Sequence, residues 1–155
     1  MALPLAYLKS KNGLPAGELN PDRDNCGLMW FSPLIPLDPP IVRDYVQELT
    51  RICLAHDIDP LITLTAFSAR CFDSTIPILY SREIEGDADK ARRCYDELLK
   101  EGVLMGLFPY RLDIDHMHLL DDPGVPAFWM AQAIKKALDP HNLVAPGRYV
   151  NGRLA

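Results

Sequence analysis

The stretch Leu28-Met29-Trp30-Phe31-Ser32-Pro33-Leu34-Ile35-Pro36-Leu37-Asp38-Pro39-Pro40 decides the fold, because a buried strand is followed closely by the start of a helix. The apolar run from Leu28 to Ile35 is bounded by Gly27 and Pro36, which favours a buried strand. Asp38 then supplies an N-cap, and the two prolines after it suit early helical positions. Apolar residues follow at helical spacing, so we expect an amphipathic helix to about His56.

The remaining elements continue this alternation of strands and helices. Threonine alternates with apolar residues over 61–67, which predicts a strand, and a second strand is expected over 75–80 after a bend at Asp73-Ser74. A helix is expected from Gly86 to a stop at Gly102, then an extended segment over 103–109 and a helix over 126–138. This order predicts an α+β fold, a ferredoxin-like antiparallel sheet with helices packed on one face.

Composition limits the class of protein. A chain of 155 residues with 48% hydrophobic and 24% charged residues is long enough for one domain with a core and has the usual balance of a soluble protein. A net charge of −5 gives no basic footprint for nucleic acid, and no apolar run is long enough for a membrane span. The apolar start lacks a basic region, so no secretory signal is expected. None of the four cysteines forms a CxxC pair, so we expect reduced thiols and a cytoplasmic location.

The tail Ala137-Leu138-Asp139-Pro140-His141-Asn142-Leu143-Val144-Ala145-Pro146-Gly147-Arg148-Tyr149 combines a helix stop, a turn and a stiff elbow. The residue before a proline avoids the α region, so Asp139-Pro140 ends the helix. Pro146 fixes its own φ, and Gly147 permits a turn that side chains disfavour. Such stiffening indicates that Arg148 is aimed at a specific target, and the alternative is a surface arginine after a turn.

Three motifs in the same order resemble the vanillyl-alcohol oxidase and p-cresol methylhydroxylase family of FAD-linked oxidases. They are Cys26-Gly27-Leu28-Met29-Trp30-Phe31-Ser32-Pro33, the pair Tyr110-Arg111, and the tail. The resemblance covers roughly residues 17–150. It implies a C-terminal cap domain over 26–155, with residues 1–25 as an incoming connection.

The family binds the FAD pyrophosphate in a separate N-terminal domain with glycine-rich loops, and this sequence contains no such cluster of glycines. The resemblance therefore implies that the N-terminal FAD-binding domain is absent from this chain. We expect a partner FAD-binding domain or subunit, and we expect the chain alone to be inactive. Related enzymes pair through their cap domains, so the resemblance also implies a homodimer.

The same resemblance implies that Tyr110 and Arg111 are catalytic. They would hold the phenolate oxygen of a small, para-substituted aromatic substrate while hydride passes to the flavin. An arginine beside a phenolic hydroxyl suits this role, because charge-assisted hydrogen bonds favour the charged form of a bound phenol. The alternative is that Arg111 pairs with Asp113 or Asp115 at the surface while Tyr110 packs at a strand end.

Three further residues, Arg148, Trp30 and Asn142, are candidates for cofactor binding. A fixed guanidinium at Arg148 would stabilise the negative charge of a reduced flavin. Trp30 would form an aromatic wall of the cavity, or it would pack in the core as large aromatic side chains commonly do. The family attaches its flavin to a histidine or tyrosine near this strand, and residues 18–31 contain neither, so we expect FAD to be held without a covalent bond.

Two acidic features admit alternatives. The tract Asp113-Ile114-Asp115-His116-Met117-His118 has the residue types of a metal site. On a strand or a helix these side chains would diverge, so no metal is expected, although either histidine could serve in acid–base chemistry. Asp73 stands where the family often has a histidine, and it is either a substitute base or a solvated turn residue.

A function of another class stays open from the sequence. The chain would then be a non-catalytic ferredoxin-like module that binds a small ligand or oligomerises through a sheet face.

Overall fold

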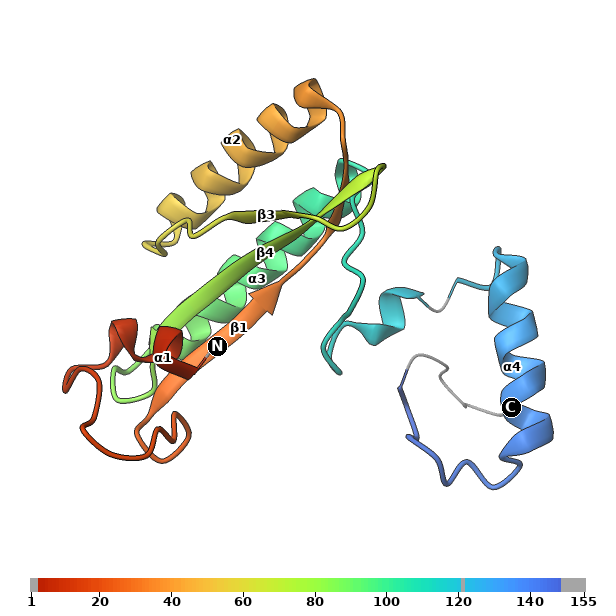
Figure 1. The fold of residues 1–155 in the computed structure, drawn as a ribbon. Helices are drawn as coiled ribbons and strands as arrows, with labels where there is room; N and C mark the ends of the chain where they lie inside the picture. Colours follow the sequence, from red (N-terminus) through yellow and green to blue (C-terminus); the bar gives the residue numbers. More distant parts are fainter. Residues whose placement is uncertain (1–2, 121, 149–155) are drawn as a thin grey trace. The chain divides into compact units, whose positions relative to one another are not determined.

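A computed structural model describes residues 3–120 and 122–148, and the chain divides into two compact units at Tyr110 and Arg111 (Figure 1). The first unit holds the sheet, and the second holds a long helix and the tail. Tyr149, the last residue of the tail motif, lies outside the described residues.

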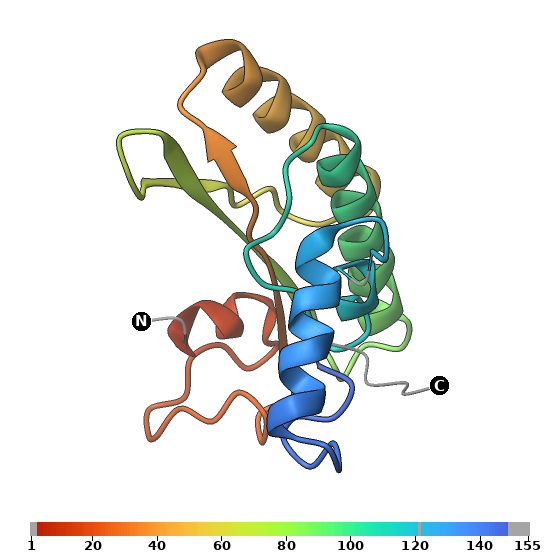
Figure 2. The ribbon, with the colours of Figure 1, turned by 90° about the vertical axis from the view of Figure 1, so that its right-hand side faces the viewer.

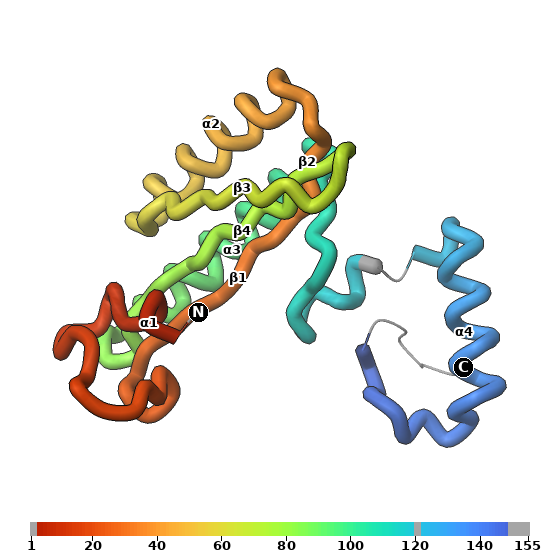
Figure 3. Tube along the Cα trace, viewed as in Figure 1, coloured from red at the N-terminus to blue at the C-terminus, as the bar shows by residue number. Residues whose placement is uncertain are grey.

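The sheet of the first unit is built around one long strand, β4 (Cys71–Ser81). Strand β1 (Cys26–Phe31) runs antiparallel to it, and β2 (Leu34–Pro36) continues in the same register along the same edge. Figure 3 traces this passage from β1 into β2. The strand expected over 28–35 is therefore present, but it is interrupted at Ser32 and Pro33, where a proline has no N–H to donate. The amide of Ser74 donates to the carbonyl of Pro33 at 3.1 Å and bridges the interruption.

Strand β3 (Thr63–Ala66) lies on the other edge of β4, because Asp73 pairs with Leu34 of β2 and with Thr65 of β3. Its position confirms the strand expected from the alternation of threonine with apolar residues.

The helices α2 (Pro39–Ala55) and α3 (Asp87–Leu104) cover one face of this sheet. The side chain of Asp38 accepts from the amide of Ile41, so the expected N-cap is confirmed. The ring of Phe31, fully buried, meets that of Tyr95 edge to face at 6.1 Å between centroids. The predicted α+β class, an antiparallel sheet with helices on one face, is confirmed.

The extended segment expected over 103–109 is wrong for its first part, residues 103–106. Helix α3 continues to Leu104, and Gly106 ends this region at φ +74°. Gly102 does not stop the helix. It is buried within α3, where an added Cβ would lie 3.1 Å from the ring of Phe31, so packing explains this glycine. Strand-like pairing begins at Phe108, and Pro109 forms a bridge with Pro33.

The bend expected at Asp73-Ser74 is also wrong, because both residues lie inside β4. The chain reverses earlier, over residues 67–70, where the amide of Phe67 donates to the carbonyl of Cys71 at 3.1 Å.

The first residues pack on the opposite face of the sheet from α2 and α3. The short helices α1 (Leu3–Ala6) and η1 (Tyr7–Lys9) place Ala6 and Tyr7 against Cys26, in a small apolar cluster that also includes Leu28. Cys26 and Leu28 alternate with Phe31 along β1, so they point away from the helical face. Figure 1 shows α1 in front of the sheet and α3 behind it.

The second unit contains η2 (Met117–Leu120), α4 (Pro126–Leu138) and the tail (Figure 2). The helix expected over 126–138 is confirmed. None of the side chains that the structure describes on α4 is buried, and Trp129, Met130 and Ile134 are all exposed. No helix within the described residues is long and apolar enough to cross a membrane.

Candidate functional site

The sheet face opposite α2 and α3 is the candidate site. Neighbouring residues of a strand point to opposite faces, and the hydroxyl of Ser74 shares a buried hydrogen bond of 2.6 Å with that of Tyr45 on α2. Ser74 therefore faces the helices, and Asp73 and Thr75 face the other way. Trp30 pairs with Pro77 and Leu34 pairs with Asp73, so both residues lie on this second face as well.

Within the first unit, the N-terminal cluster covers only one end of this face. At the other end Trp30 is 40% exposed and Leu34 37% exposed. The core packing considered as the alternative for Trp30 is therefore not found, and the neighbouring Phe31 is fully buried instead.

Tyr110 joins the same face from a third stretch of chain. The amide of Tyr110 donates to the carbonyl of Ser32 at 3.2 Å, and the amide of Leu34 donates to the carbonyl of Phe108 at 3.2 Å. These two bonds flank the bridge between Pro33 and Pro109, so residues 108–110 run antiparallel along the free edge of the interrupted strand. Residues opposite each other in such a ladder share a face. Tyr110, 50% exposed, and Phe108, 54% exposed, therefore lie on the face of Trp30.

We call this surface the open face and define it by the residues Trp30, Ser32, Leu34, Asp73, Thr75, Phe108 and Tyr110. Sequence reasoning singled out Trp30 and Tyr110 and missed Phe108. The signal that could have found Phe108 is a large apolar side chain directly before Pro109-Tyr110.

Asp73 is the charged residue of the open face. It is a half-buried strand residue and not a solvated turn residue, which corrects one of the two alternatives for it. Its Oδ1 atom is buried, and no described residue forms a hydrogen bond with it. A buried carboxylate oxygen without a donor is costly, so such an atom in a folded protein calls for a partner.

The remaining predicted residues lie in the second unit. Arg111 is exposed and follows directly on Tyr110. Arg148 is exposed, and its amide donates to the carbonyl of Ala145 at 3.1 Å. Gly147 adopts φ +75°, which confirms the turn expected there. Asn142 has φ +51°, and its Oδ1 is a second buried acceptor that finds no donor among the described residues.

Asp139 organises the tail. Its carboxylate accepts from the amides of Leu143 at 2.8 Å and Val144 at 2.9 Å, and it pairs with the Nζ of Lys135. The Lys135 ammonium, followed by these two amides, lowers the pKa of Asp139 to about 2. The expected stiffness of the tail therefore depends on a carboxylate as well as on proline and glycine.

The acidic and histidine tract forms a turn. Asp113 Oδ1 accepts from the amides of Asp115 at 2.9 Å and His116 at 3.1 Å, and it lies 2.7 Å from the ring Nδ1 of His116. Asp113 thereby closes the turn that leads into η2. Over residues 3–120 and 122–148, no group of three potential ligands is placed to hold a metal ion.

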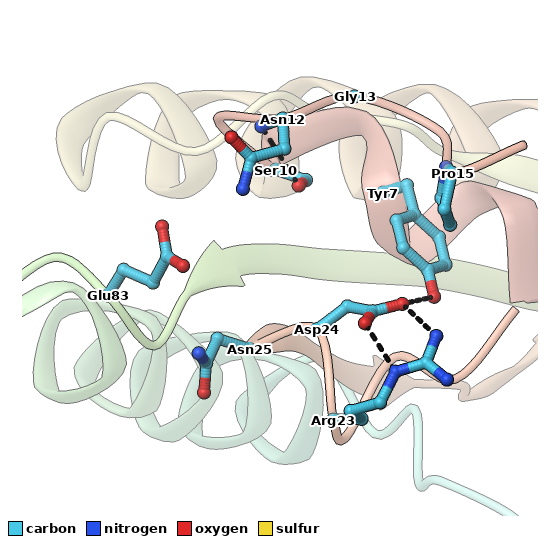
Figure 4. Close-up of a pocket in the computed structure, with 9 residues that line it drawn as sticks. All are labelled: Tyr7, Ser10, Asn12, Gly13, Pro15, Arg23, Asp24, Asn25 and Glu83. Atoms are coloured by element: carbon cyan, nitrogen blue, oxygen red, sulfur yellow. Dashed lines mark hydrogen bonds and ion pairs between the residues drawn. The ribbon is translucent and has the colours of Figure 1, made fainter.

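A separate cavity of about 350 Å³ lies beside the N-terminal segment (Figure 4). Its polar centre is Asp24, which accepts from the hydroxyl of Tyr7 at 2.6 Å and from the Nε of Arg23 at 2.8 Å. These hydrogen bonds, that of Arg23 first, lower the pKa of Asp24 to about 2. The carboxylate is saturated by its own neighbours, and none of the residues proposed from the sequence lines the cavity. Asp24 therefore links Tyr7 of η1 to the residues directly before β1.

Comparison with known proteins identifies the family of this chain. No protein-family model matches the chain. Its relatives and structural neighbours are FAD-linked oxidases of the p-cresol methylhydroxylase and vanillyl-alcohol oxidase type, so the family recognised from the sequence is confirmed. The chain spans about a quarter of the length of these proteins, which is consistent with a C-terminal cap domain.

Two curated relatives carry this assignment. The chain is 32% identical over 144 residues to the 1'-carboxy-chondrochloren decarboxylase of Chondromyces crocatus, covering 93% of this chain and 26% of the relative. It is 27% identical over 127 residues to the flavoprotein subunit of the hydroxylating 4-cresol dehydrogenase of Pseudomonas putida, covering 81% of this chain and 24% of the relative.

Two solved structures share the fold. p-Cresol methylhydroxylase with substrate bound matches with a TM-score of 0.73 and 26% identity, over 80% of this chain and 24% of that one. The 4-ethylphenol oxidase of Gulosibacter chungangensis, in an isoeugenol complex, matches with a TM-score of 0.73 and 20% identity, over 81% of this chain and 25% of that one, and it supports the fold alone.

Proposed function

We propose that this chain is the substrate-binding cap part of an FAD-dependent oxidoreductase that oxidises a small, para-substituted phenolic or other aromatic substrate by hydride transfer to flavin. The observation that carries this proposal is the open face. It exposes Trp30 and Tyr110 on the same face of the sheet, in a chain that is similar to a 4-cresol dehydrogenase subunit and to p-cresol methylhydroxylase.

The residues of this chain would bind and orient the substrate. The hydroxyl of Tyr110 and the guanidinium of Arg111, adjacent in sequence, would hold the acidic oxygen of the ring, and the positive charge favours the phenolate. The exposed ring of Trp30 would stack on the substrate and exclude water from one side.

The tail has two groups suited to contact the ring system of a flavin. Arg148 supplies a cation after a turn at Gly147, and the buried Oδ1 of Asn142 is an acceptor that a ring N–H would satisfy. When bound, the flavin accepts the hydride. The phosphate-binding glycines are not in this sequence, so the pyrophosphate would be held by a partner FAD-binding domain or subunit, and the FAD would be held without a covalent bond from this chain.

Exposed apolar side chains of α4, among them Trp129 and Met130, support a partner and also support the second candidate function. In that case the chain is a non-catalytic module that binds a small ligand or forms a homodimer.

Flavin uptake separates the two functions. The purified chain would be mixed with FAD alone, and with FAD plus the part of the Pseudomonas putida flavoprotein subunit that this chain does not match. We expect uptake, followed by the flavin absorbance spectrum, only in the second mixture. No uptake in either mixture would contradict the enzymatic proposal.

Arg111→Lys tests the proposed site in the assembled protein. The substitution keeps the charge and removes the planar fork, so we expect 4-cresol to bind at least several-fold more weakly. Arg92→Lys, the same change at an exposed position of α3, is the matched control and should leave binding unchanged. Equal binding by the two variants would refute the role of Arg111.

A further inference from the structure

The proposed function assigns no role to Asp73. It is half-buried on the open face, and its Oδ1 finds no donor among the described residues. The neighbouring side chains on this face include the hydroxyls of Thr65, directly opposite on β3, and of Thr75, two residues along β4, yet neither donates to it. No described residue engages Oδ1 of this half-buried side chain, so Asp73 is suited to accept a hydrogen bond from a group outside the described part of the chain.

The register of the strands places Asp73 at one end of a defined surface. Tyr110 lies opposite Ser32 on the free edge of the interrupted strand, and Asp73 lies on β4, on the far side of that strand. Two strand spacings of about 4.8 Å and an offset of two residues, about 3.3 Å each, separate the Cα atoms of Tyr110 and Asp73 by about 12 Å. Side chains on one face of a sheet stand roughly perpendicular to it, so the end groups of Tyr110 and Asp73 keep a similar separation, which one ring with a short para substituent spans together with a hydrogen bond at each end.

The surface between these ends has larger side chains at its borders than at its centre. Its floor consists of two small side chains, those of Ser32 and Thr75, at the same level of the sheet as Tyr110. The larger side chains of Trp30 and Leu34, each two residues from Ser32, flank this floor on either side along the strand.

We propose that Asp73 selects among para-substituted aromatic ligands, by accepting a hydrogen bond from a hydroxyl or ammonium group at the para end while the phenolic oxygen lies toward Tyr110. A carboxylate at the para end meets the negative charge of Asp73 and is disfavoured. The inference rests on the proposed function for its ligand class, and it adds the preference for a donor at the end of the ligand remote from the phenol.

Three probes with the same ring isolate this preference: 4-hydroxybenzylamine, 4-hydroxybenzyl alcohol and 4-hydroxybenzoate. The carboxylate is the informative contrast, because one relative is named for a carboxylated compound. Each probe would be titrated into the purified full chain, with the indole N–H signal of Trp30 followed by NMR. Trp129, whose indole donates to the carbonyl of Pro123 in the second unit, serves as the internal reference.

We expect the amine and the alcohol to shift the Trp30 signal and the carboxylate to bind at least tenfold more weakly than the amine, as a charge-assisted hydrogen bond predicts. Asp73→Asn should reduce the ratio of amine to carboxylate affinity about tenfold. Asp44→Asn, the same change at an exposed position of α2, should leave the ratio as it is in the original chain. Asp73→Ser is the second variant and should behave as Asp73→Asn does.

Equal binding of the amine and the carboxylate by the original chain would overturn the proposal, and so would an unchanged ratio in a folded Asp73 variant or the lack of any shift of Trp30. The last two results would mean that solvent satisfies Asp73. None of these measurements uses flavin, so a failure of flavin uptake and a failure of this selection are distinguishable.

Discussion

The buried hydrogen bond between Tyr45 and Ser74 fixes which way β4 faces, and its removal gives a quantitative test of the fold. Both residues have no exposed surface, and their hydroxyl oxygens lie 2.6 Å apart. Burial raises the pKa of the Tyr45 hydroxyl above its usual range and so favours the protonated group that the hydrogen bond with Ser74 uses. The bond joins α2 to the centre of the sheet, next to Asp73 on the opposite face.

Tyr45→Phe leaves the Ser74 hydroxyl buried without its partner, and Ser74→Ala does the same to the Tyr45 hydroxyl. Each single change should lower the free energy of unfolding by about 2 kcal/mol, the cost of an unsatisfied buried hydroxyl. The double variant loses only the net value of the hydrogen bond and should lose about 1 kcal/mol. The coupling energy between the two sites is then about 3 kcal/mol. Losses at independent sites add to within about 0.5 kcal/mol, so a coupling of this size is easily distinguished from additivity.

Equilibrium unfolding in urea, followed by far-ultraviolet circular dichroism, measures all four proteins on the same scale. If the two single losses simply add in the double variant, the two hydroxyls are independent. In that case the assignment of Ser74 to the helical face, and with it the placement of Asp73 on the open face, is refuted.

The other predictions concern the sheet edge and the tail. An added Cβ at Gly27 would lie 2.3 Å from the ring of Tyr80, so Gly27→Ala should lower the free energy of unfolding by roughly 1–3 kcal/mol, whereas Gly17→Ala, in open space, should be close to neutral in the same urea titration. The lowered pKa of Asp139 means that its stabilisation of the tail is present above the ordinary carboxyl pKa of 3.8 and is lost as the pH falls through about 2. Hydrogen exchange of the tail amides should accelerate over this acidic range relative to intrinsic rates, and Asp139→Asn should show the faster exchange already at pH 5.

The sequence correctly predicted the elements that specific residue types mark, either at their ends or by alternation. The acidic cap at Asp38 and the prolines after it located the start of α2, and the alternation of threonine with apolar residues located β3. Pro126 and Leu138 bound α4 as expected, because proline suits a first helical turn and Asp139-Pro140 ends the helix.

The wrong predictions concern residues whose local sequence suits two different secondary structures. The apolar residues 103–107 suit either a helix end or a strand, and periodicity cannot separate these over so short a run. Gly102 resembled a helix stop, but the ring of Phe31, more than seventy positions earlier in the numbering, explains why the position needs glycine. The bend expected at Asp73 is part of strand β4 instead, because pairing with β2 on one edge and β3 on the other holds this stretch extended.

By itself, the sequence determined the α+β class, the family and the identity of the residues proposed to bind an aromatic ring. These properties follow from local spacing, turn chemistry and motif order, all of which are contained in short stretches. Only the tertiary structure decided which sheet face the helices cover and that Trp30, Asp73 and Tyr110 lie on the other one. The physical reason is that a strand offers the same alternation to both of its faces, and packing between distant segments chooses which face is closed.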